Sequence, residues 1–353
     1  MSAADPPAPD DPIDAYVENL RSSGLGKNSV DGYEQVLNNH LRPFLEQRGL
    51  EAGDATRHEC RELIEEMVND PDLDVDTAEK YAGVMSRFYG HFNERGTFEV
   101  NPMKLAMDNY DFGDSSKDYK REITIPQMRE FIQQIDNPIT LVVIMLLIKT
   151  GIRVGELCNI DMRDVHIDDP RVKDLFPPLR PEIADQPDSI YIEAHTNMQA
   201  GQVTNGERRV ASNKRKRATI IPIDDELKKV LVFWLAIRPE PQNHPGNPFV
   251  TRLIGHVRTQ VGDRMSNGRV HTIVTNATEE RGWWDSDNSK AMNVSPHYFR
   301  HFFTTYMRDR TNDDVFVQFI RGDKGEEAMD DYTHNWGDKV RTTYNKHIYK
   351  LLR

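Results

Sequence analysis

The spacing of apolar residues divides the chain into a helical first part and a mixed second part. Four segments between residues 11 and 112 carry apolar residues at helical spacing and end near Gly or Asp-Pro. They read DPIDAYVENLRSSG, KNSVDGYEQVLNNHLRPFLEQRG, TRHECRELIEEMVND and TAEKYAGVMSRFYGHFNERG. We expect about four or five helices with short connections, forming a small helical domain over residues 11–112. Residues 1–10, which are acidic and rich in proline, are expected to be a flexible N-terminus.

A linker separates this helical part from the second domain. The stretch FGDSSKDYKRE contains Gly, Ser and mixed charges without periodicity, which predicts a linker over residues 113–122. The domain that follows, 123–353, opens with the helix TIPQMREFIQQI, which has Pro in its first turn. The middle of PITLVVIMLLIKTGIRVGELCNI is apolar all round, which predicts a buried helix that ends at Thr-Gly before another helix begins.

The remaining elements of the second domain include short strands and further helices. SIYIEAH and RATIIPI have the composition of short strands, and a long polar loop lies between them. DDELKKVLVFWLAI and HYFRHFFTTYMRDR have helical periodicity. The predicted fold class is therefore mainly α with a small β-sheet.

Length and composition limit the kind of protein. A chain of 353 residues is long enough for about two or three domains, each with its own core. No apolar run is long enough to cross a membrane, and the start lacks the features of a secretory signal, so we expect a cytoplasmic protein. Cys60 and Cys158 are the only cysteines, which predicts neither a disulfide framework nor a zinc cluster.

The charge of the chain bears on its partner. A net charge of -12 argues at first against a nucleic-acid partner. However, 34 Asp stand against 23 Glu, and 29 Arg against 16 Lys. An acidic surplus with Arg favoured over Lys is typical of proteins from a high-salt cytoplasm, where local basic clusters are more informative than net charge.

The densest basic cluster lies in ERRVASNKRKRATIIPI. Six basic residues occupy ten positions: Arg208, Arg209, Lys214, Arg215, Lys216 and Arg217. Such charge runs are most often solvated loops. The cluster is nevertheless the strongest candidate for contact with a nucleic acid.

Two further segments carry candidate chemistry. In TGIRVGEL, Arg153 directly follows the buried helix, and Glu156 lies one turn on, an arrangement common in ordinary ion pairs. An arginine at this place is expected at the edge of the core, facing a cleft. In SPHYFRHFFTTYM, Ser295-Pro296 predicts a helix start, so that His297 and Arg300 lie on one face of its first turn, where a phosphate can bind.

The chain resembles the tyrosine recombinases, also called the phage-integrase family, in the order of four motifs. These are TGIRVGEL, NKRKRATIIPI, HYFRH and a late tyrosine. The resemblance covers nearly the whole chain. It implies a helical SAM-like core-binding domain that clasps DNA, followed by a mixed α+β catalytic domain. It also implies a site-specific recombinase or integrase that cuts and rejoins double-stranded DNA through a 3′-phosphotyrosine intermediate, without a cofactor or a metal ion.

The resemblance selects a nucleophile among three C-terminal tyrosines. In the family the tyrosine follows the HxxR arginine at a roughly constant interval and stands in a phrase like Tyr-Thr-His. Tyr332 fits both features, since 332 − 300 = 32 and the local phrase is DDYTH. Tyr344 is the second choice, and Tyr349 is expected to be a packing residue.

The same resemblance assigns the other site residues. It implies that Arg153 and Arg300 clamp the phosphate, that His297 takes or relays the tyrosine proton, and that Glu156 supports the arginine pocket. A family lysine precedes the strand phrase, here IIPI, and 222 − 8 = 214 places it at Lys214, with Lys216 as the alternative. That lysine would protonate the leaving 5′-oxygen, and the neighbouring basic residues would contact DNA.

One position departs from the family. Nine residues before the tyrosine (332 − 9 = 323), family members carry His or Trp after a Gly, whereas this chain has Asp323 in IRGDKGEEAMDDY. A carboxylate cannot donate a hydrogen bond to phosphate unless it is protonated. Either His334 takes that place, or Asp323 orders Arg or His side chains from behind.

Two other functions and one assembly question stay open at this stage. A type IB topoisomerase-like enzyme uses similar residues to relax supercoils, and a DNA-binding regulator could have lost catalysis. Val340, Tyr344, Ile348 and Leu351 form an apolar stripe on a predicted C-terminal helix. Such a helix either folds onto its own domain or, as the resemblance suggests, docks on a neighbour in a ring of four subunits on DNA.

Overall fold

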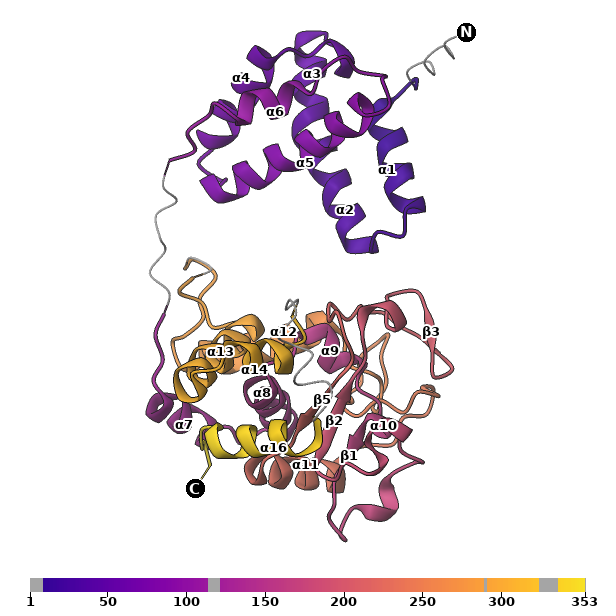
Figure 1. The fold of residues 1–353 in the computed structure, drawn as a ribbon, viewed down its shortest axis with the longest axis vertical. Helices are drawn as coiled ribbons and strands as arrows, with labels where there is room; N and C mark the ends of the chain where they lie inside the picture. The colour runs from indigo at the N-terminus through magenta and orange to yellow at the C-terminus, as the bar shows by residue number, and fades with distance from the viewer. Residues whose placement is uncertain (1–8, 114–120, 289–290, 324–335, 353) are drawn as a thin grey trace. The chain divides into compact units, whose positions relative to one another are not determined.

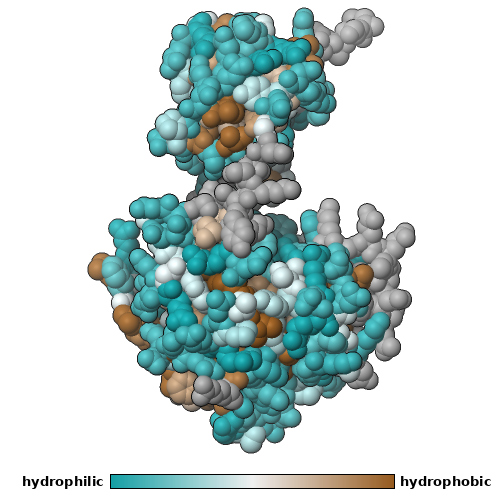
Figure 2. Space-filling model, turned by 90° about the vertical axis from the view of Figure 1, so that its left-hand side faces the viewer, coloured by the Kyte–Doolittle hydropathy of each residue, from teal (hydrophilic) through white to brown (hydrophobic). Residues whose placement is uncertain are grey.

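The computed structural model describes residues 9–113, 121–288, 291–323 and 336–352 (Figure 1). The chain divides into two compact units, Met1–Asp118 and Tyr119–Arg353. Each unit has its own hydrophobic core. On the face shown in Figure 2, hydrophilic residues cover most of each unit and apolar side chains gather in small areas.

The first unit is built from helices. They are α1 (Pro12–Ser22), α2 (Lys27–Val36), α3 (Arg42–Arg48), α4 (Arg57–Val68), α5 (Val75–Asn93) and α6 (Pro102–Met107), with a π-helical turn Leu37–Leu41 and a 3-10 turn Ala52–Asp54. The side chain of Asp11 caps α1, and Thr56 with Glu59 forms a capping box at α4, which supply acceptors for otherwise unpaired N–H groups. The sequence pattern did not predict α6, a short helix that Asn101 caps and Pro102 begins.

The second unit surrounds one buried helix. Its α-helices are α7 (Ile125–Gln133), α8 (Pro138–Thr150), α9 (Val154–Asn159), α10 (Pro181–Ala184), α11 (Asp225–Ile237), α12 (Asn267–Glu279), α13 (Pro296–Thr311), α14 (Asp314–Arg321) and α16 (Trp336–His347). Helix α8 packs against α11, α12 and α13, and its residues from Val142 to Thr150 are all buried. This confirms the buried helix predicted from its all-round apolar sequence.

Two small sheets accompany these helices. Strands β1 (Val165–His166), β2 (Ser189–Ile192) and β5 (Thr219–Pro222) form an antiparallel sheet in the order β1-β2-β5. Strands β3 (Val203–Thr204) and β4 (Glu207–Arg208) form a hairpin whose turn, Asn205-Gly206, has positive φ at both positions, as a tight hairpin turn requires. Short 3-10 turns span Met162–Asp164, Lys173–Leu175 and His195–Asn197. The sequence pattern predicted β2 and β5 but missed β1, the hairpin, α12 and α14.

Helix α16 packs on its own unit, against β5 and α13. Val340, Tyr344, Ile348 and Leu351, the apolar stripe of the C-terminal segment, are all buried. Of the two alternatives for this helix, the structure matches the one in which it folds onto its own domain, because the domain that carries the stripe already covers it.

Candidate active site

Arg153 stands where the chain leaves the buried helix α8. Gly151 ends that helix with a positive φ of 62°, and a Cβ there would overlap the ring of Phe303 in α13. Only glycine tolerates this close approach, which brings the α8–α9 connection against α13. Arg153 is the N-cap residue of α9, and Glu156 accepts from it: the backbone N–H of Arg153 donates to Oε2 (3.0 Å) and its Nη1 to Oε1 (3.2 Å).

Arg300 enters the same region from α13. Pro296 begins this helix and Ser295 is its N-cap residue, as predicted, although the Ser295 side chain makes no capping hydrogen bond. Arg300 is only 2% exposed. Its Nη1 donates to the carbonyl oxygens of Gly151 (2.6 Å) and Arg321 (3.2 Å), and its Nη2 also donates to Arg321 O (3.2 Å).

Asp323 joins the two arginines. Its Oδ1 accepts from Arg153 Nη2 (2.7 Å) and from Arg300 Nη2 (2.6 Å), while Oδ2 lies 3.0 Å from Nη2 of Arg321. The structure thus brings two guanidinium groups from distant motifs to a single oxygen atom. Of the two interpretations of Asp323, this arrangement matches the one in which the carboxylate orders arginines. His334 lies outside the described residues.

A buried ion pair between Arg215 and Glu156 supports this cluster from the interior of the unit. Arg215 is fully buried, with its Nη2 3.2 Å from Glu156 Oε2 and its Nη1 donating to Ile320 O (2.9 Å). Gly322 has a φ of 64°, and a Cβ there would overlap the Arg215 side chain. The glycine before Asp323 is therefore required both by its backbone conformation and by the arginine that passes beside it.

Lys214 lies between two anchored residues. Asn213 donates to Glu193 O (2.8 Å) and accepts from Asn159 (2.9 Å), while Arg215 is held by Glu156. Lys214 itself is exposed, and Lys216, also exposed, donates its backbone N–H to Gly322 O (3.2 Å). The segment is irregular, and the tight turn of this region lies at Asn205-Gly206.

The basic cluster is less uniform than the sequence suggested. Arg208, Lys216 and Arg217 are exposed. Arg209 is buried in a paired contact with Asp161, Nη1 to Oδ1 at 3.0 Å and Nη2 to Oδ2 at 2.5 Å, and Arg215 is buried against Glu156. The expectation that Arg209 and Arg215 contact DNA is corrected here, because their guanidinium groups neutralise interior carboxylates.

His297 lies in the first turn of α13, three residues before Arg300. It lines a cavity of about 710 Å³ between α13 and the segment Arg121–Thr124. Its side chain is exposed, yet surrounding protein atoms, followed by His301 and by the charges of Arg300, Arg153 and Arg321, lower the pKa of His297 to about 4. The ring is therefore neutral at neutral pH and can accept a proton.

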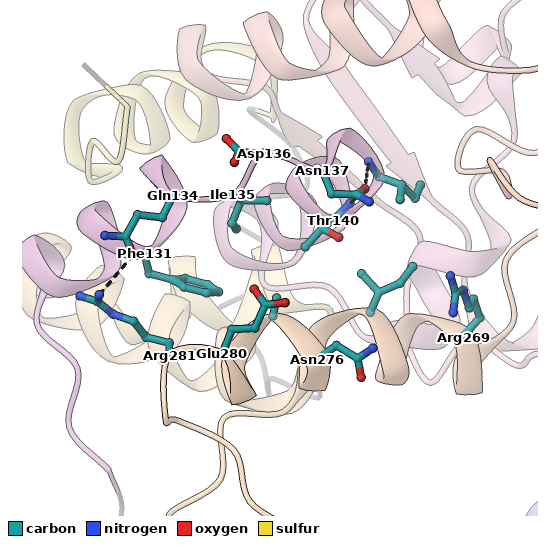
Figure 3. A pocket seen from close by; sticks show the side chains of 13 residues that line it. Phe131, Gln134, Ile135, Asp136, Asn137, Thr140, Arg269, Asn276, Glu280 and Arg281 are labelled. Atoms are coloured by element: carbon teal, nitrogen blue, oxygen red, sulfur yellow. Dashed lines mark hydrogen bonds between the residues drawn. The ribbon is translucent and has the colours of Figure 1, made fainter.

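A second cavity, of about 530 Å³, lies between α7, the start of α8 and α12 (Figure 3). Gln134 and Arg281 meet at its edge, where Arg281 Nη1 donates to Gln134 Oε1 (3.2 Å). None of the residues predicted to act in chemistry lines this cavity.

The tyrosines divide clearly. Tyr344 and Tyr349 are buried, and their hydroxyl groups donate to the carbonyl oxygens of Lys149 and Ile148. Burial raises the pKa of Tyr344 and that of Tyr349 well above the ordinary value, which disfavours a phenolate at either position. Tyr349 is a packing residue, as predicted, and Tyr344 is a poor candidate nucleophile. Tyr332 lies outside the described residues.

The described part of the chain contains neither a metal-binding cluster nor a membrane-spanning helix. No group of three or more His, Cys, Asp or Glu side chains there is arranged to hold a metal ion. No described helix is both long and apolar enough to cross a bilayer.

The chain was compared with protein families and with known proteins of similar sequence. No family model matches the chain. A tyrosine recombinase (XerC) of Vibrio parahaemolyticus is 23% identical over 334 residues, covering 92% of this chain and 88% of the relative. A tyrosine recombinase (XerC) of Corynebacterium glutamicum is 25% identical over 201 residues, covering 57% of this chain and about half (48%) of the relative.

Solved structures agree with these relatives. The Tn1549 transposon integrase in complex with a circular intermediate DNA superimposes with a TM-score of 0.64 at 15% identity, covering 96% of this chain and 95% of that one. A lambda integrase dimer bound to a COC′ core site gives 0.57 at 15% identity, with coverages of 90% and 95%.

The chain has the fold of the tyrosine recombinases. The relatives and the solved structures support the resemblance inferred from the motifs, and they confirm the predicted fold class. Within this tyrosine-recombinase fold, sequence reasoning missed one residue at the site. Arg321 faces Asp323, and the only signal for it was its place two residues before the position that departs from the family.

Proposed function

We propose that this protein is a site-specific DNA recombinase or integrase that cuts and rejoins double-stranded DNA through a 3′-phosphotyrosine intermediate. One observation carries the proposal: Arg153 and Arg300 present their Nη2 atoms, at 2.7 and 2.6 Å, to one anionic oxygen of Asp323. A non-bridging oxygen of a phosphodiester is an anion of the same kind, and guanidinium groups match phosphate geometry.

The proposed reaction is a pair of transesterifications. The oxygen of Tyr332 attacks the scissile phosphorus, the new bond joins tyrosine to the 3′-phosphate, and the bond to the 5′-oxygen breaks. Rejoining reverses these steps with a 5′-hydroxyl as the nucleophile, so the phosphotyrosine conserves the bond energy. Arg153 and Arg300 would stabilise the charge that develops on the non-bridging oxygens.

Two residues are proposed to move protons. His297, whose lowered pKa leaves it neutral at neutral pH, would accept or relay the proton of the Tyr332 hydroxyl. Lys214, exposed between anchored neighbours, would give a proton to the leaving 5′-oxygen. Lys216 is the alternative donor, since its backbone is tied to Gly322 at the same place.

Other residues support this machinery. Glu156 holds Arg153 and Arg215, and Asp323 holds both clamp arginines, so each acts as a positioning residue. Arg208, Lys216 and Arg217 remain exposed and are proposed to contact the DNA backbone. In the proposed division, residues 11–112 form the core-binding domain, 113–122 the linker and 123–353 the catalytic domain.

We also infer assembly on DNA. Lambda integrase has been solved as a dimer on a core site and, with a TM-score of 0.56 to this chain, as a tetramer bound to a Holliday junction. By analogy this protein would act as a homo-oligomer on double-stranded DNA, a tetramer in the synaptic complex. Because the stripe on α16 is covered by its own domain, that assembly must use other surfaces.

The experiment that tests the function is covalent trapping. A suicide duplex with a nick next to the scissile phosphate releases a short 5′-hydroxyl strand, so the protein–DNA adduct accumulates and is resolved on a denaturing gel. The unaltered protein and Tyr344→Phe should form the adduct, while Tyr332→Phe should form none yet bind the duplex normally. An adduct retained by Tyr332→Phe would exclude this nucleophile.

The alternatives give different results in related assays. A type IB topoisomerase-like enzyme would relax supercoiled plasmids without exchanging strands between two sites. If the protein is a regulator without catalysis, the unaltered protein and both tyrosine variants would bind DNA, and none of them would form an adduct.

We infer that the protein works in the cytoplasm of a cell with high internal salt. The support is compositional: 34 Asp, 29 Arg and a net charge of -12. Filter binding over a KCl series tests this inference. Affinity should fall less steeply than the number of phosphate contacts alone implies, and a complete loss of binding at molar KCl would contradict it.

A further inference from the structure

A third arginine faces the carboxylate that joins the clamp. Arg321 is the last residue of α14, and its Nη2 lies 3.0 Å from Asp323 Oδ2, on the opposite oxygen from the one shared by Arg153 and Arg300. Its side chain is 21% exposed. Its charge is felt by both Arg300 and His297. Arg321 therefore belongs to the same electrostatic site, although the proposed reaction has so far given it no part.

Most of the hydrogen-bonding capacity of Arg321 is unused by the residues that the structure describes. Its contact with Asp323 is an ion pair, its guanidinium donates no hydrogen bond to another described residue, and its buried Nε has no acceptor. In Arg300, by contrast, both Nη groups already donate hydrogen bonds, to Gly151 O, Arg321 O and Asp323. A guanidinium with five donors that makes one ion pair still has donors to offer to a ligand.

The charges of the described residues at this site do not balance. Four guanidinium groups, those of Arg153, Arg215, Arg300 and Arg321, face two carboxylates, those of Glu156 and Asp323. Arg215 is neutralised by Glu156 in the interior. The excess positive charge is then left on the outer three arginines, around one carboxylate, where it favours an incoming anion.

We propose that Arg321 is a third phosphate-binding arginine, which Asp323 holds beside Arg153 and Arg300 and which supplies the donor that a histidine or tryptophan provides in the family. The proposal rests on the proposed function and adds a residue to it. Asp323 acts as the template: Oδ1 gathers two guanidinium groups and Oδ2 gathers the third. No bond is made or broken by Arg321, which binds a non-bridging oxygen as negative charge accumulates there.

The test compares a charged with a neutral scissile group. Arg321→Met keeps the length of the side chain and removes its charge. Adduct formation is measured with two nicked suicide duplexes, one with a normal phosphate and one with a methylphosphonate, in which a methyl group replaces a charged oxygen. On the phosphate, Arg321→Met should be slower than the unaltered protein by about 10²-fold, as for loss of one transition-state donor. On the methylphosphonate the difference should shrink to within a few-fold, because less charge remains to be neutralised.

Two further variants make the test specific. Arg321→Lys keeps the positive charge and should form adduct at least about tenfold faster than Arg321→Met on the phosphate. Arg308→Met removes an arginine from an exposed pair with Asp314 (2.8 Å) and should behave like the unaltered protein on both substrates. Circular dichroism and duplex binding establish that each variant is folded.

Three results would overturn the proposal. They are an Arg321→Met rate within threefold of the unaltered protein, an equal loss on both substrates, or no recovery in Arg321→Lys. Equal loss would show that Arg321 only supports the fold. If the unaltered protein forms no adduct at all, the proposed function fails together with this inference, whereas a normal adduct with an unaffected Arg321→Met removes Arg321 alone.

Discussion

Two ionic clusters in the second unit use the same chemistry in opposite ways. Beneath the C-terminal tail, Lys149 is fully buried and its Nζ donates to Asp224 (2.9 Å), Glu226 (2.7 Å) and Tyr349 O (2.7 Å). Lys350 adds a second positive charge against Asp224 (3.1 Å). This tail cluster is balanced, with two positive and two negative groups; Lys149, Asp224 and Glu226 are buried, Lys350 is exposed, and all three donors of the Lys149 ammonium group are used.

The arginine cluster around Asp323 is open and unbalanced. Arg153 and Arg321 are partly exposed while Arg300 is buried, and the positive charge of the three exceeds the negative charge of the carboxylates that the structure describes there. The comparison teaches that a satisfied, neutral cluster holds structure together, whereas a cluster with spare donors and excess charge is suited to binding.

The largest effect is expected from removing the tail. Deleting residues 338–353 removes the buried side chains of Val340, Tyr344, Ile348, Tyr349 and Leu351. At about 1.5–3 kcal/mol for each large apolar side chain, the loss is comparable with the whole stability of a typical domain. We expect circular dichroism and gel filtration to show an unfolded catalytic unit. A folded truncation that binds one DNA site but fails in strand exchange would instead favour docking of the tail on a neighbour.

Lys149→Met should destabilise the protein by about 3–5 kcal/mol, because it removes the only buried cation that the structure describes beside Asp224 and Glu226 and leaves the exposed Lys350 against Asp224 alone. Urea unfolding measures this change. Lys228→Met is the matched control: Lys228 pairs with Asp188 at 2.8 Å but is 24% exposed, so its loss should cost about 1 kcal/mol or less. Equal effects of the two substitutions would remove the distinction between a dry and an open pair.

Arg153→Ala should act on rate rather than on stability. Loss of one transition-state donor lowers adduct formation by about 10²–10³-fold, or about 2.7–4 kcal/mol, while the affinity for duplex stays near normal. The exposed pair Arg171–Asp169 provides the control, since Arg171→Ala should leave the rate unchanged. A rate for Arg153→Ala within a few-fold of the unaltered protein would make this arginine structural.

Tyr344→Phe should have a small structural effect and no catalytic one. It removes the hydroxyl that donates to Lys149 O at 2.7 Å in the interior, which costs about 1 kcal/mol. Thermal unfolding records the loss, and the suicide duplex should still capture the variant at the normal rate. A missing adduct would return Tyr344 to the list of nucleophiles.

The smallest effect is the titration of one ring. In an NMR titration of the free protein, with His297→Asn for assignment, the pKa of His297 should lie near 4 rather than near the ordinary 6.5. Since the unfolded chain binds this proton more readily than the folded protein, the stability contributed here is lost as pH falls from about 6.5 towards 4. A pKa at or above 6.5 would mean that neither burial of the ring nor the neighbouring positive charges lower its proton affinity.

Some secondary-structure elements could be predicted from the sequence and others could not. Helix α8 could be predicted because a helix that is apolar all round has only the interior to occupy, and α13 because Ser-Pro begins it. Helix α12 was missed because its pattern NGRVHTIVTNATE mixes polar and β-branched residues, and its helical state depends on packing against α8. The hairpin was missed because its strands are only two residues long.

The site shows the same limit at the level of single residues. Arg209 and Arg215 looked like members of an exposed basic run, since a sequence of like charges does not reveal which side chains have buried partners. The carboxylates that neutralise them, Asp161 and Glu156, lie far away along the chain. Asp323 looked like a departure from the family, and only its contacts reveal an arginine-gathering role.

The sequence by itself determined the order of the motifs, the class of fold and the residues from which chemistry could be built. These depend on local periodicity, capping and residue type, which act over a few positions. The tertiary structure alone decided which charged side chains are neutralised in the interior and which can still bind a ligand. The reason is that the energy of a charge depends on its burial and on partners far away in the sequence. For that reason Arg321, which no sequence motif indicated, lies beside the arginines proposed to bind phosphate, while Arg209, which belongs to the basic run, lies in the interior.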